Sequence, residues 1–250
     1  MGGPADFLYL IYLGVWVILV ENHMEIPQHI GIIMDGNRRW ARAHGLPLLE
    51  GHRRGLDNVR TALKWCVRQG VKVLTVFAFS TENWDRPPSE IKYLMKLFLQ
   101  VIKTEVKKLH QEGIRYNVIG RVSGLSAVIQ QEIKKAVELT KGNTACVFNM
   151  ALNYGGRAEI VDAIKSIVGM KLAPAQITEA AISQHLYSPA IPDPDLIIRT
   201  SGEQRLSGFL LWESAYSELY FTPTPWPDFG ESDLDAALAE YQKRQRRFGK

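Results

Sequence analysis

The feature that most constrains the fold is a repeated alternation of short apolar runs with helical patterns. Runs typical of buried strands lie at residues 29–34, 71–79, 114–119, 145–152, 196–199 and 218–221. Amphipathic patterns typical of helices lie at residues 51–69, 89–111, 126–140 and 156–168, and Ser89, Thr178 and Ser232 are expected helix caps. Strands that alternate with helices form parallel sheets covered by helices. We therefore expect one α/β domain with a central, mostly parallel six-stranded sheet flanked by helices.

Composition excludes several other classes of protein. Apolar residues make up 46% of the 250-residue chain and charged residues 22%, which is ordinary for a globular domain and excludes a disordered, collagenous or coiled-coil chain. The only cysteines are Cys66 and Cys146, without a CxxC or Cys/His cluster. This pattern excludes a disulfide framework, argues against structural zinc and favours a cytoplasmic location.

The chain is basic, with a formal net charge of +4 and a pI near 9.0. Its basic residues gather partly at the C-terminus, where a helix end favours cations, and otherwise occur singly beside loops. A nucleic-acid duplex would require a continuous basic stripe. The distribution therefore favours a phosphorylated small ligand, and we expect no nucleic-acid partner.

The N-terminus carries an uncharged apolar run of 14 residues, FLYLIYLGVWVILV, at residues 7–20. As a helix it would measure about 21 Å, which is short of the hydrocarbon core of about 30 Å. It also lacks the basic region and cleavage site of a signal peptide. Three alternatives remain open for this leader, residues 1–25: an interfacial membrane anchor, a segment packed on the domain or a partner, or a non-native extension ahead of Met24.

Polar residues follow the first and second expected strands, where ligands of parallel sheets bind. The first strand is followed by Asp35, a turn-forming Gly36 and two arginines, Arg38 and Arg39. A carboxylate beside anion-binding groups favours Mg²⁺ bridging to a phosphate, and the alternative is a carboxylate that only caps a helix. The second strand is followed by a polar loop at residues 80–88, for which an ordinary turn is the alternative.

Two later segments add further candidates. Arg199, Arg205 and Ser207 follow another strand and could bind a second phosphate, and the alternative is a solvated basic loop. Glu218 begins the last strand and could supply a second metal ligand, but a capping or surface role fits the local sequence nearly as well. His52 follows Gly51 near a helix start and is a third phosphate-site candidate.

Several long motifs occur together in a fixed order. They are HIGIIMDGNRRWA (29–41), GHRRG (51–55), LTVFAFSTENWDRP (74–87), NYGGR (153–157), IIRTSGEQRLSGFLLWESAYSELYF (197–221) and WPDF (226–229). With these motifs the chain resembles the cis-prenyltransferases, and most closely the bacterial undecaprenyl diphosphate synthases. The resemblance runs from about Ile26 to Phe248, and we expect residues 26–250 to form the catalytic domain.

The resemblance implies an enzyme that adds isopentenyl diphosphate repeatedly to an allylic diphosphate such as farnesyl diphosphate, forming cis double bonds. It further implies a long-chain product such as undecaprenyl diphosphate, the lipid carrier for cell-wall synthesis, together with Mg²⁺, an apolar product tunnel and a homodimer. Alternatives are a medium-chain cis-prenyl diphosphate synthase and a non-catalytic partner subunit of the same fold. Peripheral membrane contact through residues 7–20 is expected if that segment is an anchor.

The resemblance also assigns residues. Asp35 matches the catalytic aspartate and metal ligand, Glu218 the second metal ligand, and Asn83 the proposed proton acceptor. The family's allylic diphosphate site corresponds in this chain to Gly36, Asn37, Arg38, Arg39, Trp40 and His52. The loop after the second strand matches Ser80, Thr81, Glu82, Trp84 and Arg86. The isopentenyl diphosphate site matches Arg199, Arg205, Leu206 and Ser207.

Two further expectations concern the residues that line the tunnel and one position, Leu48, at which the chain departs from the family pattern. Candidate tunnel residues, for which plain core packing is the alternative, are Ala78, Phe79, Leu94, Phe98, Ile114, Cys146, Phe148 and Leu152. Leu48 stands where the family often carries an arginine. A lost charged contact of this kind is worth roughly 1.5–3 kcal/mol, and Arg38, at a position that is often glycine, could compensate.

Overall fold

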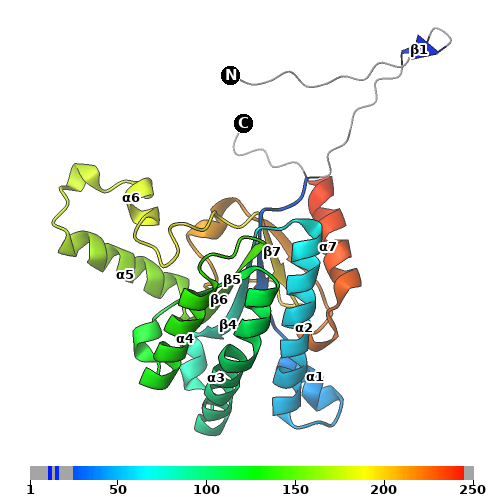
Figure 1. Cartoon of the computed structure of the whole chain (residues 1–250), viewed down its shortest axis with the longest axis horizontal. Helices are drawn as coiled ribbons and strands as arrows, with labels where there is room; N and C mark the ends of the chain where they lie inside the picture. Colours follow the sequence, from blue (N-terminus) through cyan, green and yellow to red (C-terminus); the bar gives the residue numbers. More distant parts are fainter. Residues whose placement is uncertain (1–10, 13–14, 17–24, 245–250) are drawn as a thin grey trace.

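A six-stranded sheet forms the centre of the computed structural model, which describes residues 11–12, 15–16 and 25–244. Its strands are β3 (His29–Ile33), β4 (Val73–Ser80), β5 (Ile114–Ile119), β6 (Cys146–Tyr154), β7 (Leu196–Arg199) and β8 (Glu218–Phe221). The strand order is β5-β6-β4-β3-β7-β8, and every neighbouring pair is parallel (Figure 1). The predicted α/β fold is therefore confirmed, and the sheet is parallel throughout.

Among the described residues, seven helices accompany the sheet and cover it unequally. They are α1 (Asn37–Ala43), α2 (Leu48–Gln69), α3 (Pro88–Gln111), α4 (Ala127–Thr140), α5 (Gly156–Gly169), α6 (Glu179–Ser183) and α7 (Glu231–Lys243). The main core packs α2, α3, α4 and α7 against one face of the sheet. A smaller core on the other face places Phe209 and Leu210, from the loop after β7, against Ile33 and Tyr154. The larger apolar volume therefore lies beneath α2 and α3.

The predicted helix starts are correct at two positions, Gly156 of α5 and Thr178 before α6, and wrong at three. The Thr178 hydroxyl accepts from the amide of Ala181 at 3.1 Å and caps α6, as expected. Helix α3 begins at Pro88, before Ser89, because proline suits the first helical position, which needs no amide donor. Helix α7 begins at Glu231, before Ser232, and the α2 helix begins at Leu48, three residues before the predicted start.

The predicted N-terminal leader lies mostly outside the described residues. Within it, the described residues are Glu25 and the strands β1 (Ile11–Tyr12) and β2 (Val15–Trp16), which pair with each other in antiparallel register. Across the described residues, no helix has the length and apolar character needed to span a membrane.

Candidate active site

The chemistry-bearing residues meet because three neighbouring strands end at the same edge of the sheet. Strand β3 lies between β4 and β7, and all three run in the same direction. Asp35 follows β3, Asn83 follows β4, and Arg199 is the last residue of β7. The carboxyl ends of central parallel strands are where ligands of such sheets bind. The predicted location of the site is therefore consistent with the sheet that forms.

Hydrogen bonds fix both the side chain and the backbone carbonyl of Asp35. Its Oδ2 accepts from Nη2 of Arg199 at 2.9 Å, and its Oδ1 accepts from the amide of Gly36 at 2.7 Å. Its backbone carbonyl accepts from the hydroxyl of Thr200 at 2.7 Å and from the amide of Trp226 at 2.9 Å. Helix α1 has no side-chain cap, so the alternative that Asp35 only caps a helix does not apply.

Gly36 is required at this turn. Its φ is 102°, and an added Cβ would lie 2.6 Å from the hydroxyl oxygen of Ser201. Both the left-handed backbone and the close contact disfavour any side chain. The glycine thus allows the chain to turn directly from Asp35 into α1, which presents its arginines beside that carboxylate.

A polar pocket of about 450 Å³ adjoins Asp35 on the α1 side. Its lining includes Asp35, Gly36, Asn37, Arg38, Arg39, Arg42, His52, Arg86, Glu203 and Arg205. Five arginines face two carboxylates in this lining, so the pocket carries an excess of positive charge. It is therefore suited to a compact polyanion such as a diphosphate.

Several residues around Asp35 carry buried polar atoms without a hydrogen-bond partner. Asn37 Oδ1, Arg38 Nε, His52 Nε2 and Arg199 Nε have no hydrogen-bond partner within the described chain. A buried polar atom without a partner costs about 1–3 kcal/mol, which a ligand could recover. Burial, together with the nearby Arg86, lowers the pKa of His52 to about 4, so its imidazole is neutral at physiological pH.

A second polar pocket of about 640 Å³ lies on the other side of Asp35. Its polar lining comprises Asp35, Ser80, Thr81, Glu82, Asn83, Arg86, Arg157, Arg199 and Ser207, with Gly155, Gly156 and Gly208 contributing backbone. Arg199 Nη1 donates to the hydroxyl of Ser207 at 2.8 Å. Asp35 and Arg86 line both polar pockets, so the two pockets meet at these residues.

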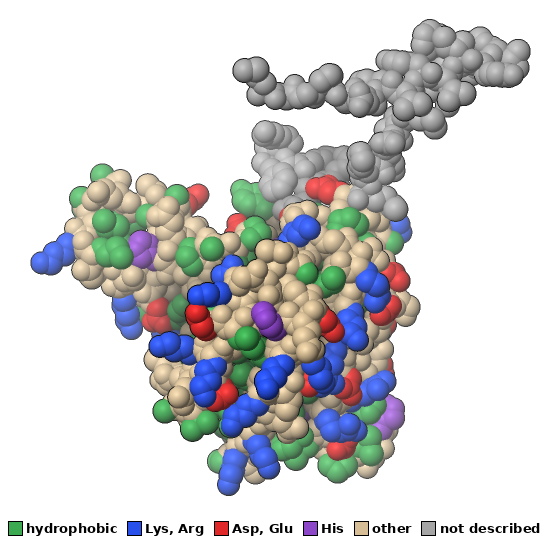
Figure 2. Space-filling model, in the orientation of Figure 1, with side chains coloured by type: hydrophobic (Ala, Val, Ile, Leu, Met, Phe, Trp, Pro, Cys, Tyr) green, Lys and Arg blue, Asp and Glu red, His purple; other side chains and the backbone are tan. Residues whose placement is uncertain are grey.

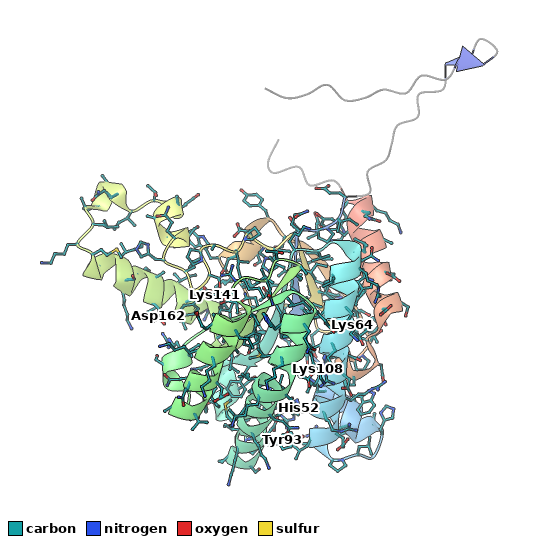
Figure 3. All side chains as sticks on the ribbon, viewed as in Figure 1. His52, Lys64, Tyr93, Lys108, Lys141 and Asp162 are labelled. Carbon is teal, nitrogen blue, oxygen red and sulfur yellow. The ribbon has the colours of Figure 1, made fainter. Side chains whose placement is uncertain are left out.

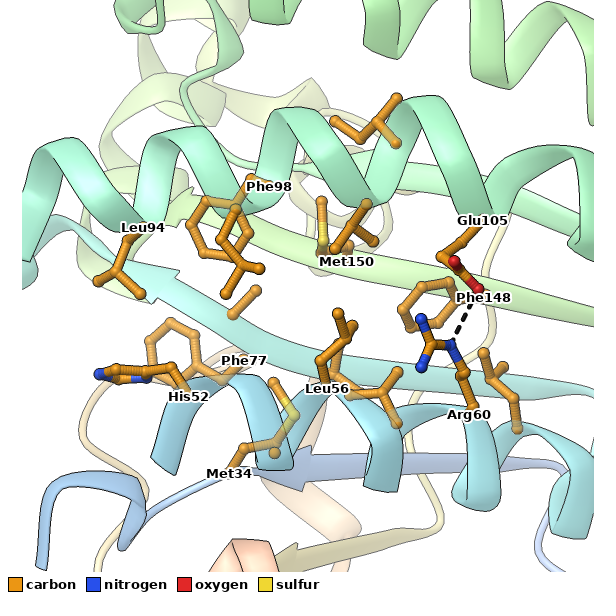
Figure 4. A pocket seen from close by; sticks show the side chains of 18 of the residues that line it. Met34, His52, Leu56, Arg60, Phe77, Leu94, Phe98, Glu105, Phe148 and Met150 are labelled. Carbon is orange, nitrogen blue, oxygen red and sulfur yellow. Dashed lines mark hydrogen bonds and ion pairs between the residues drawn. The ribbon is translucent and has the colours of Figure 1, made fainter. Parts of the chain in front are cut away.

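An apolar chamber of about 170 Å³ adjoins the two polar pockets and lies between α2, α3 and the strands β4 and β6 (Figure 4). Met34 and Arg86 line all three cavities. Four predicted tunnel residues line the chamber: Ala78, Leu94, Phe98 and Phe148. The other four belong to the buried core instead: Phe79, Ile114, Cys146 and Leu152.

The loop after β4 is a short 3₁₀ turn, Thr81–Asp85, that carries the predicted polar residues. Asn83 Oδ1 accepts from the amide of Ser80 at 3.2 Å, so one amide oxygen is already engaged in holding the turn. Trp84 Nε1 donates to Asn153 Oδ1 at 2.7 Å, and Trp84 does not line either polar pocket. Arg86 Nη1 binds Glu90 at 3.2 Å.

Besides Trp84, two further predicted substrate-site residues lie outside these cavities. Trp40 Nε1 donates to Asp228 at 2.7 Å, and its ring stacks on His44. Leu206 packs against the smaller core. Both side chains fix the positions of neighbouring loops, and neither lines the described pockets.

Glu218 lies apart from Asp35 within one chain. It pairs in register with Leu196, which pairs with Ile30 near the start of β3. Asp35 is therefore about 16 Å further along the strand direction, at the opposite edge of the sheet. Glu218 Oε2 instead binds Nη1 of Arg244 at 2.9 Å. The two carboxylates cannot hold one ion within a single chain.

Four site residues escaped the sequence analysis. Arg42 follows Arg38 by one helical turn, and Arg157 ends the motif NYGGR, so spacing could have indicated both. Glu203 binds Arg39 at 3.1 Å and also pairs with Arg205. Glu90 is 7% exposed and lies within ion-pair distance of Arg38, Arg86 and His52, a convergence that only the folded chain reveals.

Comparison with known proteins identifies the family. A family model described as "Putative undecaprenyl diphosphate synthase" matches residues 33–249. An isoprenyl transferase of Heliobacterium mobile is 50% identical over 229 residues, covering 90% of this chain and 88% of the relative. A farnesyl-diphosphate-specific ditrans,polycis-undecaprenyl-diphosphate synthase of Pasteurella multocida is 49% identical, covering 90% and 95%.

Solved structures give the same result. Lavandulyl diphosphate synthase from Lavandula x intermedia, in complex with dimethylallyl diphosphate, superposes with a TM-score of 0.87 at 40% identity, covering 90% of this chain and 98% of that one. A probable undecaprenyl diphosphate synthase of Campylobacter jejuni gives a TM-score of 0.78 at 31% identity, covering 90% and 100%. The chain therefore belongs to the undecaprenyl diphosphate synthase family of prenyltransferases and is a transferase.

Proposed function

We propose that this enzyme elongates an allylic diphosphate, such as farnesyl diphosphate, with isopentenyl diphosphate to give a long-chain cis-polyprenyl diphosphate. Undecaprenyl diphosphate, the lipid carrier for cell-wall synthesis, is the product we favour. The observation that carries the proposal is the arrangement of two cationic pockets that share Asp35 and Arg86 beside one apolar chamber. Two diphosphates and one hydrocarbon tail need three such compartments. The printed names of the relatives support the same reaction.

The pockets receive different substrates in this proposal. The allylic diphosphate occupies the pocket of Arg38, Arg39 and Arg42, because that pocket shares Asn37 and His52 with the apolar chamber that would accept the allylic tail. Isopentenyl diphosphate occupies the pocket of Arg199 and Ser207. Its short hydrocarbon part then faces Asp35, at the junction of the two pockets.

Asp35 fits a magnesium ion carried by the substrate phosphates. The described residues contain no group of three His, Cys, Asp or Glu side chains that could hold a metal by themselves. Mg²⁺ commonly uses one or two carboxylates together with substrate phosphates, so a single carboxylate between two diphosphate pockets suits it. When bound, the ion would stabilise the charge of the leaving diphosphate. Glu218 has no part in that site within one chain.

The protein's own groups supply the remaining chemistry. The arginines hold the diphosphate that leaves as allylic cation character develops, which lowers the barrier to bond formation. The proton lost from the new unit leaves beside Asp35 and Asn83. Asparagine is a poor base at neutral pH, and its oxygen already accepts from Ser80. We therefore assign Asn83 a positioning role, with the proton passing to Asp35, the diphosphate or water.

Arg38 is expected to replace the arginine that the family often carries at Leu48. Arg38→Met should raise the KM for the allylic diphosphate about tenfold to a hundredfold, because one charged contact of roughly 1.5–3 kcal/mol is lost. The control is Arg53→Met on α2, whose side chain is 62% exposed and lines neither polar pocket. Initial rates over a range of allylic substrate test this; an unchanged KM in Arg38→Met would contradict it.

We further propose that the enzyme is a homodimer that associates through α5. The helix exposes Val161, Ile164, Val168 and, just beyond its end, Met170, with exposed fractions of 45–68%. The first three lie on one helical face, and α5 and α6 form a lobe at the side of the molecule that bears hydrophobic side chains (Figures 1 and 2). An apolar stripe of this kind is typical of an interface between proteins.

Ile164→Asp is expected to convert the dimer into a monomer, because it places an unpaired charge in the apolar contact. Lys165→Asp, at the neighbouring position where the side chain is 73% exposed, should leave the dimer intact. Sedimentation velocity distinguishes the two species. A monomeric wild-type protein, or a dimeric Ile164→Asp variant, would contradict this interface.

The proposed reaction is tested with the purified full chain, labelled isopentenyl diphosphate and farnesyl diphosphate, with Mg²⁺ or with excess chelator. We expect Mg²⁺-dependent products that elute as long polyprenols after dephosphorylation. Shorter products would favour the medium-chain alternative and keep the chemistry. The absence of product with farnesyl, geranyl or geranylgeranyl diphosphate would favour the non-catalytic partner subunit.

A further inference from the structure

The apolar chamber is too small for the product that the proposed function requires. Its volume is about 170 Å³, little more than the cavity of about 150 Å³ that accommodates one benzene molecule. A farnesyl tail has two and a half times as many carbons as benzene, and each elongation step adds five more. The walls of the chamber must therefore separate as the chain grows.

Two polar bridges connect the helices that form those walls. Near the polar pockets, His52 Nε2 of α2 lies 3.7 Å from Glu90 Oε1 of α3. Further along, Arg60 Nε of α2 donates to Glu105 Oε2 of α3 at 2.9 Å. The Arg60–Glu105 bridge lies about 12 Å from the first along α2 and about 22 Å along α3. Figure 4 shows His52 on the left of the chamber and the Arg60–Glu105 pair well to its right.

The second bridge is a charged pair in an otherwise apolar part of the lining. Apolar residues line the cavity on both sides of it: Leu56 and Phe98 toward the mouth, and Leu63, Val106 and Leu109 beyond. An apolar path therefore passes the pair and does not end there.

Neighbouring groups hold both members of the pair in place. Asp57 also binds Arg60, and Thr104 donates to Glu105 Oε1 at 3.2 Å. Lys108 lies 3.4 Å from the same carboxylate oxygen. The Glu105 side chain is 12% exposed, whereas that of Arg60 is 40% exposed. Because Arg60 already contacts water and keeps Asp57 as a second partner, it can leave Glu105 at little cost.

We propose that the Arg60–Glu105 pair is a clasp between α2 and α3 that must open for the chamber walls to separate around the growing hydrocarbon chain, and that it thereby influences product length. This inference rests on the proposed function. With the clasp closed, the walls can separate only toward the mouth, at Leu56 and Phe98, which leaves room for the first additions only. With the clasp open, the part of the chamber lined by Leu63, Val106 and Leu109 can widen and receive a longer tail.

A covalent lock tests the clasp directly. In the double variant Arg60→Cys/Glu105→Cys, a short bifunctional thiol reagent joins α2 to α3. The native Cys66 and Cys146 are 0% and 2% exposed, and burial raises the pKa of both thiols, so they should not react. We expect the locked enzyme to perform the first addition at the rate of the same variant before locking, and to release truncated products.

Opening the clasp should have the opposite effect. Arg60→Met and Glu105→Gln should shift products toward longer chains than those of the wild type. The matched control is Arg68→Met, which removes an ion pair between α2 and Glu231 of α7, away from the chamber. Its product distribution should equal that of the wild type.

The outcomes separate the two proposals. Full-length products from the locked enzyme, shown by mass to be cross-linked, would overturn the clasp, even if the single variants failed to fold. Unchanged lengths in Arg60→Met and Glu105→Gln would likewise overturn it while the first addition still supports the proposed function. A wild-type chain that adds no isopentenyl unit would overturn both.

Discussion

Asp35→Asn is expected to lower kcat for prenyl transfer by about 10²–10³-fold, the loss typical when one group that stabilises transition-state charge is removed. The carboxylate lies where both polar pockets meet, and it is the one acidic side chain that lines both. Asparagine keeps an oxygen for Arg199, and the backbone contacts to Thr200 and Trp226 are unaffected. The fold and its thermal stability should therefore change little.

The measurement is the initial rate at saturating substrates, with a melting curve for each variant. The control is Asp162→Asn on α5, which removes an equally close carboxylate–arginine pair, 2.8 Å from Arg121, at a position remote from α2 and His52 (Figure 3). It should retain wild-type kcat. An Asp35→Asn enzyme with more than about a tenth of wild-type kcat would contradict the role assigned to this residue.

Trp226→Ala is expected to reduce the free energy of unfolding by about 3–5 kcal/mol, as for other large aromatic residues removed from a core. The side chain is 1% exposed and stacks on Phe229. Its Nε1 donates to the carbonyl of Gly55 on α2 at 2.7 Å, and its amide donates to the carbonyl of Asp35 at 2.9 Å. The residue thus joins the N-terminal half of α2 to the turn that carries Asp35.

Denaturant unfolding of the wild type and of Trp226→Ala measures this difference in the free energy of unfolding. In Trp226→Phe, the phenyl ring fills most of the volume of the indole but cannot make the hydrogen bond to Gly55. Its free energy of unfolding should therefore fall by less than that of Trp226→Ala. Asp35 should also be less well positioned in Trp226→Ala, which lowers kcat in addition to stability. A Trp226→Ala protein within about 1 kcal/mol of wild type would show that the site tolerates the cavity and would contradict this account.

The sequence predicts the strands well because each is a short apolar run, and it predicts the position of the site because the polar motifs follow those runs. Asp35, Asn83 and Arg199 come together for this reason, since β3, β4 and β7 are parallel neighbours. The sequence does not reveal the order of the strands, because pairing depends on contacts between distant segments. The role of Glu90, which gathers three basic side chains from α1, α2 and the loop after β4, depends on such contacts.

The residues that line the chamber, and the position of Glu218 relative to Asp35, could not be predicted from the sequence. Phe79 and Phe98 are both aromatic, and only the direction of each side chain decides that Phe98 lines the chamber while Phe79 packs in the core. Glu218 matches a family motif, but the parallel register of β8 sets it at the sheet edge opposite Asp35. Local sequence carries no information on which edge of the sheet a motif will occupy.

The most direct test of the central claim is the geometry of the double bond formed in the first condensation. The purified chain would be incubated with farnesyl diphosphate, one equivalent of ¹³C-labelled isopentenyl diphosphate and Mg²⁺, and the product examined by NMR. The account predicts a single new cis double bond, formed by the wild type and strongly reduced in Asp35→Asn. A trans double bond, or no condensation product from an enzyme that binds both diphosphates, would contradict it.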